Sequence, residues 1–419
     1  MGFSIFKFGG ASVKSDESIR GVGQIVKNKV DLIIVVSAMG KTTNQLEGVL
    51  KAFYAKGNFN EHLSAIKNYH LNIISQLFGN VNNEVGESCE KVFAYIDKYL
   101  LHAEGLSKDE VYDQIIPAGE LLSSKILSAY LNSVGFENQW LDARKLLLTD
   151  NYYGRAHIKW KESEALIQEQ CVLPKNYVIQ GFIGGGENNK MTTLGREGSD
   201  YTAGILANML NAESLTVWKD VPGVLNADPR YFNNPIKLDR ISYREAVELA
   251  YYGATIIHPD TIKPLQNKNI PLWVKSFNHP NEKGTLISSD GELDSAKPIY
   301  IFKPNQVLIS LSPKDFSYIN EEQLSRIFKI LHDFKMDVNS MQNSAINFSF
   351  CTDLNQEKLD KAISEFGKLY RVFYNTNLEL LTVRHYIYEQ VVQLVAHKEV
   401  LLEQKTRSTI KFVLRSNTE

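Results

Sequence analysis

The chain has 419 residues, of which 43% are hydrophobic and 22% are charged, and its formal net charge is −2. These values are typical of a globular protein with two or three domains and exclude a disordered chain. The basic residues are dispersed, which argues against a nucleic-acid surface, and no segment is long and apolar enough to span a membrane. The three cysteines are far apart, so we expect a reducing, cytoplasmic location rather than a disulfide framework.

The first 290 residues alternate short apolar segments with amphipathic ones. Strands are predicted over residues 4–8, 32–37, 139–142, 177–182 and 214–219, and helices over residues 17–27, 46–55 and 121–133. This alternation predicts an α/β fold in which helices cover both faces of a mostly parallel sheet. Residues 32–36 (LIIVV) are apolar throughout, which indicates a strand buried on both sides at the sheet centre. Apolar residues at helical spacing predict a helical insertion over residues 58–108.

Residues 6–13 (FKFGGASV) lead a strand directly into a Gly-Gly turn followed by a serine. Glycine lets the backbone approach a phosphate closely, and both the start of the next helix and the charge of Lys7 favour an anion there. Similar turns occur in α/β proteins for packing reasons alone. This segment by itself therefore leaves phosphate binding and packing both open.

Three later segments also stand out. Residues 191–203 (MTTLGREGSDYTA) combine glycines and hydroxyls with one arginine and one aspartate, and residues 218–230 (WKDVPGVLNADPR) end a strand with charges of both signs. The glycine-rich residues 181–186 open no helix, so they predict a hairpin or phosphate-covering loop rather than a dinucleotide site. Together with residues 6–13, residues 191–203 and 218–230 form one constellation.

In this order the segments resemble the aspartate kinase family of the amino-acid kinase superfamily, whose first motif usually reads KFGGTSV and whose second usually reads GRGGSD. The similarity continues through residues 270–275 (IPLWVK) and 284–287 (GTLI), and so covers about residues 1–290. The resemblance implies a catalytic domain over residues 1–290 with the αβα sandwich of the amino-acid kinase fold. It also implies ATP- and Mg²⁺-dependent phosphorylation of L-aspartate to 4-phospho-L-aspartate, the entry to lysine, threonine, methionine and diaminopimelate synthesis.

A carboxylate is already a nucleophile, so this reaction needs no general base, and the difficulty lies in bringing two anions together. We predict that Lys7 stabilises the transferring phosphoryl group, while Gly9 and Gly10 offer backbone donors. Asp200 matches the acidic residue of the family's second motif and is expected to orient Lys7 or the magnesium environment. No protein ligand is assigned to Mg²⁺, because the ion keeps several waters when it bridges phosphates.

An amino-acid substrate also presents an α-carboxylate and an α-ammonium group. Arg196 can clamp a carboxylate through two parallel hydrogen bonds, and Glu120 in residues 118–123 (AGELLS) can accept from an ammonium. Both match family substrate positions, although Glu120 could also simply interact with the N-terminal dipole of its helix. The other residues that match the substrate pocket are Ser37, Thr43 and Ser199. Lys219, Asp220 and Arg230 match the family's ATP-contacting turn, and Leu225 occupies a further predicted ATP-binding position in the same turn.

Four positions depart from the family pattern. Ala11 replaces a threonine, and Glu197 replaces a glycine and adds a negative charge near the predicted anion site. Leu225 stands where a tyrosine is frequent, and Thr255 where a lysine is frequent. The last two departures concern the predicted contacts to the base and the phosphates of the nucleotide.

After a polar linker at residues 288–297, the pattern changes to shorter units. The predicted elements are strand 306–312, helix 321–335, strands 336–341 and 345–352, helix 357–367 and strand 370–375. This βαββαβ order is a ferredoxin-like plan, and over residues 299–376 it resembles the ACT regulatory domain of aspartate kinases. The resemblance implies that residues 337–341 take part in binding an amino-acid effector, lysine or threonine, and that the chain forms a homodimer or higher homo-oligomer.

Residues 377–419 predict only a partial second ACT-like unit, with strand 378–384, helix 387–404 and strand 409–414. The family commonly carries two such units, so we expect the incomplete one to borrow sheet partners from another subunit. Residues 398–415 alternate basic and apolar side chains and indicate a solvated helix face.

Two other functions stay open on the sequence alone. One is another carboxylate or carbamate kinase of the superfamily, such as a glutamate kinase, although its members usually lack the ACT units. The other is a catalytically silent amino-acid sensor. The joint presence of Lys7, Glu120, Arg196 and Asp200 argues against the sensor, because a sensor has no use for charges that serve phosphoryl transfer.

Overall fold

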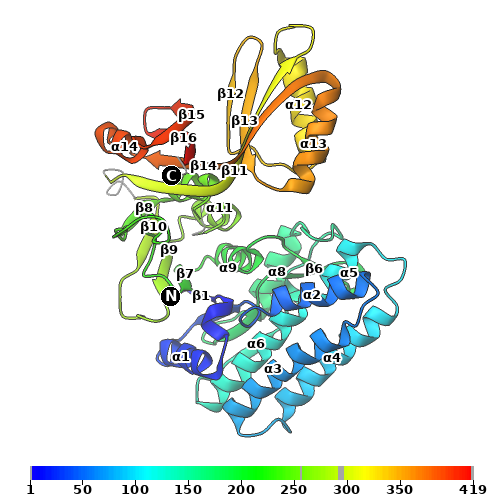
Figure 1. Cartoon of the computed structure of the whole chain (residues 1–419). Helices are drawn as coiled ribbons and strands as arrows, with labels where there is room; N and C mark the ends of the chain where they lie inside the picture. Colours follow the sequence, from blue (N-terminus) through cyan, green and yellow to red (C-terminus); the bar gives the residue numbers. More distant parts are fainter. Residues whose placement is uncertain (1, 255–256, 291–296, 417–419) are drawn as a thin grey trace. The chain divides into compact units, whose positions relative to one another are not determined.

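The chain folds into two compact units in a computed structural model that describes residues 2–254, 257–290 and 297–416 (Figure 1). The first unit comprises Met1–Val224, Lys237–Val247 and Ile256–Glu292. The second comprises Leu225–Ile236, Glu248–Thr255 and Leu293–Glu419. Two short segments that precede residue 290 thus belong to the second unit.

The first unit is built on an eight-stranded sheet with the order β3-β4-β2-β1-β7-β9-β10-β8. All neighbouring strands are parallel except β9 and β10. The strands are β1 (Ser4–Phe8), β2 (Leu32–Val36), β3 (Gln139–Leu141), β4 (Tyr177–Gln180), β7 (Ser214–Lys219), β8 (Arg240–Ser242), β9 (Leu272–Ser276) and β10 (Thr285–Ser288). Every residue of β2 is buried, which confirms its predicted place in the interior of the sheet.

Helices cover both faces of this sheet, as predicted. Alternate residues of β1 and β2, such as Phe6 and Ile34, pack with α1 (Asp16–Val26) and α6 (Ala118–Ser133) in one hydrophobic core. The opposite face packs against α9 (Gly198–Met209), which in turn lies on α11 (Pro259–Asn267). The remaining helices of this unit are α2 (Thr42–Tyr54), α5 (Lys108–Ile115), α7 (Ala143–Leu146), α8 (Trp160–Gln170) and the first residues of α10 (Tyr243–Tyr252).

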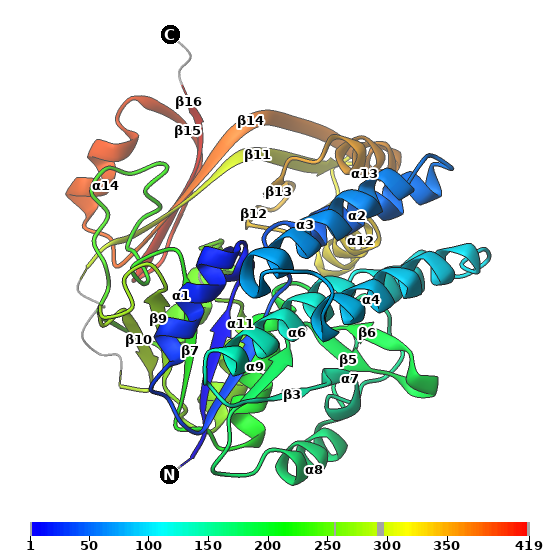
Figure 2. The same ribbon diagram turned by 90° about the horizontal axis from the view of Figure 1, so that it is seen from below.

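The predicted helical insertion consists of α3 (Asn60–Phe78) and α4 (Glu84–Leu101). The two helices lie side by side and pack along α6 (Figure 2). The predicted glycine-rich hairpin is also present, as β5 (Ile183–Gly185) paired antiparallel with β6 (Met191–Thr193). The insertion extends the core of the first unit, whereas the second strand of the hairpin forms the first three residues of the charged motif at 191–203.

The second unit is an antiparallel six-stranded sheet with the order β12-β13-β11-β14-β16-β15. Its strands are β11 (Ile299–Pro313), β12 (Ser340–Asn343), β13 (Phe348–Asp353), β14 (Tyr370–Arg384), β15 (Lys398–Lys405) and β16 (Thr409–Ser416). Helices α12 (Glu321–Asp333) and α13 (Gln356–Leu369) pack on one face around a core that contains Ile309, Phe350 and Phe366. The predicted ferredoxin-like βαββαβ order is present.

Three predictions for the second unit were wrong in detail. The helix expected over residues 387–404 ends early, as α14 (Tyr388–Val395), and the basic segment that follows is strand β15, paired with β16. Short apolar runs do not distinguish helix from strand, and here the pairing with β16 decides. Strands expected at 370–375 and 378–384 are one strand, β14, and the strand expected from residue 336 begins at Ser340.

The partial second ACT-like unit finds its sheet partners within the same chain. The first residues of β11, Ile299 to Lys303, pair with Leu380 to Arg384 of β14, and the later part of β11 pairs with Tyr370 to Asn375. Both halves of the sheet therefore share β11 and β14. The expectation that another subunit also contributes strands to this sheet stays a prediction.

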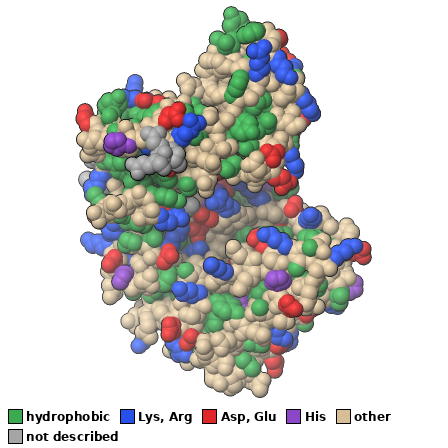
Figure 3. Space-filling model, in the orientation of Figure 1, with side chains coloured by type: hydrophobic (Ala, Val, Ile, Leu, Met, Phe, Trp, Pro, Cys, Tyr) green, Lys and Arg blue, Asp and Glu red, His purple; other side chains and the backbone are tan. Residues whose placement is uncertain are grey.

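None of the helices in the described ranges combines the length and apolar character needed to cross a bilayer. On the face shown in Figure 3, basic and acidic side chains are interspersed.

Candidate active site

A cavity of about 700 Å³ lies at the C-terminal ends of β1, β2 and β7 in the first unit. In open α/β sheets this edge is where ligands bind, because the chain turns away to opposite faces of the sheet from neighbouring strands. Nine of the predicted site residues line the cavity together: Lys7, Gly10, Ser37, Thr43, Glu120, Arg196, Ser199, Asp200 and Lys219.

The centre of the cavity is an ionic cluster of two lysines and one carboxylate. Lys7 at the end of β1 lies with its Nζ 2.5 Å from Oδ1 of Asp200, and Lys219 at the end of β7 lies with its Nζ 4.0 Å from Oδ2. Burial alone would raise the pKa of Asp200, but the charges of Lys7 and Lys219 outweigh it and lower the pKa. The lowered pKa favours the ionised form of Asp200, and its predicted role in orienting Lys7 stays a prediction.

The Gly-Gly turn is required by a close approach of two backbone segments. A Cβ atom on Gly10 would lie 2.8 Å from the carbonyl oxygens of both Ala38 and Gly40. The amide of Gly40 donates to the carbonyl of Gly10 at 3.0 Å, which fixes the turns after β1 and β2 to each other. Only glycine fits here, so the backbone of this turn lines the cavity next to Lys7.

Glu120 lies in the first turn of α6 and is fully buried. Its Oε1 accepts a hydrogen bond from the amide of Ala38 at 3.1 Å, whereas Oε2 is buried and has no partner among the residues that the structure describes. Burial raises the pKa of Glu120 to about 8, against the opposing effects of the Ala38 hydrogen bond and the charge of Lys7. An unpartnered buried carboxylate oxygen that lines a cavity suits a ligand that brings its own cation.

Arg196 and Ser199 lie at the start of α9. Arg196 is exposed, Ser199 is buried, and both line the cavity. Glu197, at the position before the helix, has a φ of 52°, a left-handed conformation that a non-glycine residue rarely adopts. This geometry accounts for the glycine that is usual here in the family pattern.

Sequence reasoning missed Asp113, which holds the loop that carries Arg196. Asp113 is fully buried on α5, and its carboxylate accepts from the amide of Gly154 at 3.0 Å and from the amide and hydroxyl of Thr193 at 2.9 and 2.7 Å. The next residue, Gln114, exchanges two hydrogen bonds with the backbone of Met191. An aspartate at an apolar position of an amphipathic helix was the available signal, since buried charges require partners.

Only some of the residues predicted to bind the nucleotide line the cavity. Lys219 lines the cavity, whereas Asp220 is exposed and is not among the lining residues. Leu225 and Arg230 belong to the second unit, where Arg230 pairs with Asp228 at 2.6 Å. Thr255 lies outside the described residues. The assignments of Gly9, Asp220, Leu225 and Arg230 to the nucleotide stay predictions.

Comparisons with known proteins find similarity over most of the chain. The model of the amino acid kinase family matches residues 3–276. The lysine-sensitive aspartokinase 3 of Escherichia coli (strain K12) is 31% identical over 353 residues, which are 83% of this chain and 78% of that protein. Chloroplastic aspartokinase 1 of Arabidopsis thaliana is 29% identical over 392 residues, which are 87% of this chain and 67% of that protein.

Similarity extends to three-dimensional structure. The crystal structure of E. coli aspartokinase III in complex with aspartate and ADP has a TM-score of 0.83 and 27% identity, and the match covers 98% of this chain and 96% of that one. This coverage includes both the parallel sheet and the antiparallel sheet. It confirms the predicted fold, an αβα sandwich followed by an ACT-type region.

Proposed function

Because the chain belongs to the amino acid kinase family, and within it to the aspartokinases, we propose that it transfers the γ-phosphoryl group of ATP to the side-chain carboxylate of L-aspartate. The products are 4-phospho-L-aspartate and ADP. The observation that carries the proposal is the joint placement of the Lys7–Asp200–Lys219 cluster and the unpartnered Glu120 carboxylate in one cavity. One part suits a phosphate and the other suits an amino group.

The two lysines reduce the electrostatic repulsion between the two anions that must meet in this reaction. The aspartate carboxylate attacks the γ-phosphorus, and the bond from that phosphorus to the bridging oxygen of ADP breaks, so negative charge gathers between two anions. Lys7 and Lys219 meet this charge, and Asp200 keeps both lysines in place without moving during the reaction. The amide groups at the start of α9 add their positive dipole end.

ATP is used as its magnesium complex, in which Mg²⁺ neutralises phosphate charge and keeps much of its water. Within the described ranges, no group of three or more His, Cys, Asp or Glu side chains is arranged to hold a metal ion. Both oxygens of Asp200 face lysines, so this carboxylate serves Lys7 and Lys219.

Polar side chains that line the cavity recognise the amino-acid substrate. Glu120 accepts from the α-ammonium group, which provides the partner that its Oε2 lacks. Arg196 clamps the α-carboxylate, and its exposure allows it to reach a ligand from the rim. The other residues proposed to contact the substrate are Ser37, Thr43 and Ser199.

The second unit is proposed to bind an amino-acid effector, with lysine the first candidate because the E. coli relative is named lysine-sensitive. In the predicted effector segment, the Asn339 side chain accepts from Lys303 at 2.8 Å and donates to Gln306 and Asp353 at 2.8 and 3.0 Å. Such a polar network can present both charges that an amino acid requires. A homodimer and a cytoplasmic location also stay predictions.

ADP release tests the proposal directly. The full chain is supplied with Mg-ATP and either L-aspartate, L-glutamate or no acceptor, with hydroxylamine present to trap the acyl phosphate. We expect turnover and hydroxamate with aspartate alone. Turnover with glutamate instead would favour a glutamate kinase, and aspartate binding without turnover would favour a sensor.

A further inference from the structure

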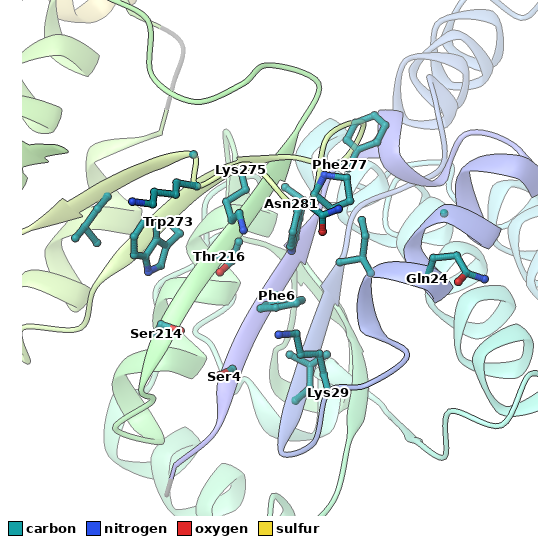
Figure 4. A pocket seen from close by; sticks show the side chains of 18 of the residues that line it. Ser4, Phe6, Gln24, Lys29, Ser214, Thr216, Trp273, Lys275, Phe277 and Asn281 are labelled. Carbon is teal, nitrogen blue, oxygen red and sulfur yellow. The ribbon is translucent and has the colours of Figure 1, made fainter. Parts of the chain in front are cut away.

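A second and larger cavity lies on the first unit, away from the proposed active site. Its volume is about 1030 Å³, and it lies over β1, β7 and β9 beside α1. Figure 4 shows Ser4 and Phe6 along β1 and Ser214 and Thr216 along β7 as its floor, with Lys29 on one side and Trp273 and Lys275 on the other. Its size is in the range of small-molecule sites.

The two cavities use the same strands through alternate residues. Successive side chains of a strand point to opposite faces, so Phe6 and Trp218 line the second cavity while their neighbours Lys7 and Lys219 line the first. None of the described residues lines both cavities. The second cavity is therefore a separate space, although its floor is continuous with the strands that carry the catalytic lysines.

Among the described residues that line the second cavity, basic side chains outnumber acidic ones: three lysines and Arg240 stand against one carboxylate, Asp239. Lys29, Lys275 and Lys283 line the cavity, and within the described part of the chain none of the three forms an ion pair with an acidic side chain. Partial burial and the nearby charge of Lys29 lower the pKa of Lys275. The lining carboxylate, Asp239, is paired with Lys237 at 2.9 Å. An anion bound between the lysines would relieve their mutual repulsion.

Aromatic side chains supply the remaining recognition surface. The Nζ of Lys275 lies 5.3 Å from the ring centroid of Trp218, and Trp273 and Phe277 are only partly buried. Trp218 itself is almost fully buried, and its Nε1 finds no hydrogen-bond acceptor among the described residues. Flat rings stack on such side chains, and an indole N–H without a partner is a donor that a ligand can use.

We propose that this cavity is a second binding site, which takes a small molecule that combines a flat aromatic ring with an anionic group. The ring lies against the aromatic side chains and the anion lies between Lys29, Lys275 and Lys283. Two sources share this chemistry, a nucleoside monophosphate and an aromatic carboxylate. Since Phe6 and Trp218 precede the catalytic lysines in the chain, a ligand here is also well placed to influence the first cavity.

Calorimetric titration of the full chain tests the proposal. The probes are AMP and indole-3-carboxylate, compared with inorganic phosphate and neutral indole, all in the presence of saturating Mg-ADP so that the first cavity is occupied. We expect one of the two aromatic anions to bind at one site per chain, about tenfold more tightly than phosphate or indole. Binding of AMP alone would identify a nucleotide ligand, and binding of indole-3-carboxylate alone would identify a carboxylate.

Variants locate the binding site. Lys29→Gln/Lys275→Gln should weaken binding at least about tenfold, whereas Lys161→Gln/Lys263→Gln, which removes two exposed lysines from α8 and α11, should not. Thermal unfolding checks that each variant folds, and the single exposed Lys283→Gln replaces the first variant if it does not. The proposal is overturned if neither aromatic anion binds at millimolar concentration, if phosphate binds as well as AMP, or if the lysine variants bind unchanged. It is also overturned if light scattering shows a dimer that Lys29→Gln/Lys275→Gln abolishes, because a second copy would then fill the cavity.

Discussion

The two cavities of the first unit are formed by the same strands, but their lysines differ in whether an acidic side chain pairs with them. Lys7 is only 8% exposed and is held by Asp200, whereas Lys275 is half-buried and has an aromatic ring beside it but no acidic partner in the described ranges of the chain. A deeply buried cation requires a permanent counter-charge, whereas a partly solvated one does not. The comparison indicates that the more deeply buried lysine is the one with an acidic partner. The unpaired lysines in the half-open cavity remain available to a ligand.

The sharpest test of this comparison substitutes one lysine from each cavity. Lys7→Met should lower kcat for aspartate phosphorylation about a hundredfold or more, because it removes a preorganised charge from the transferring phosphoryl group. Lys275→Met should change kcat less than about twofold, since Lys275 does not line the first cavity. Steady-state kinetics with circular dichroism as a fold check measures both. Equal losses in the two variants would contradict the separation of the cavities.

Glu120→Gln should raise the KM for aspartate about tenfold to a hundredfold, because a neutral amide accepts less strongly from an ammonium group. The same variant should be more stable to heat than the parent chain. The pKa of Glu120 is about 8 in the folded chain against an ordinary 4.5, so the folded chain binds the additional proton between these values. Its free energy of unfolding therefore falls as pH rises through this window.

Glutamine does not titrate, so the stability advantage of Glu120→Gln should grow from about pH 5 to about pH 8. Melting temperatures at both pH values, without ligand, provide the measurement. Glu110→Gln serves as a control, since Glu110 lies outside both cavities and pairs with Lys190 at 2.5 Å. An advantage that shrinks with rising pH would argue against a neutral Glu120 in the folded chain.

Asp113→Asn should act on the loop that carries Arg196. The new amide presents a donor to one of the backbone amides that the carboxylate now accepts from, which costs about 1–3 kcal/mol. We expect the KM for aspartate to rise more than kcat falls, because the substrate clamp is displaced while Lys7 is not. Thr193→Val should show a weaker form of the same change and Thr193→Ser almost none, since serine keeps the hydroxyl. A loss confined to kcat would refute this positioning role.

The smallest effect is expected at Glu197. Glu197→Gly should raise the free energy of unfolding by up to about 1 kcal/mol, because glycine adopts a positive φ without strain. Glu197→Gln removes the charge but keeps the backbone strain, so it should leave stability nearly unchanged. Urea unfolding midpoints distinguish the two variants. A gain with glutamine equal to that with glycine would assign the cost to charge instead.

Prediction from sequence succeeded where a local pattern determines the structure. Strands β1 and β7 have the predicted bounds, because each is a short, mostly apolar run that carries a lysine at or next to its last residue and is followed by a turn. The pairing of Lys7 with Asp200 was anticipated through the family motifs, since the two residues are far apart in the chain. Local pattern alone did not contain that contact.

Prediction failed where contacts with residues far away in the sequence determine the structure. Strand β15 forms because β16 offers a pairing edge, and its own residues fit a helix as well. Asp113 was missed because its importance depends on Gly154 and Thr193, which lie 41 and 80 residues away in the chain. Glu197 was noted as a departure, but its left-handed backbone is visible only in the fold.

The sharing of β11 and β14 has a consequence for how the second unit comes apart. Both 15-residue strands contribute to two cores. In the core under α12 and α13 these contributions are Ile309 of β11 and Tyr370 of β14, and in the core beside α14 they are Tyr300 of β11, which packs against it, and Leu381 of β14. Because the two halves of the sheet share β11 and β14, one half cannot unfold while these two strands stay intact in the other half. We therefore expect the whole sheet to behave as one cooperative foldon, in which amide protons at the two ends of β14 exchange with the same opening free energy.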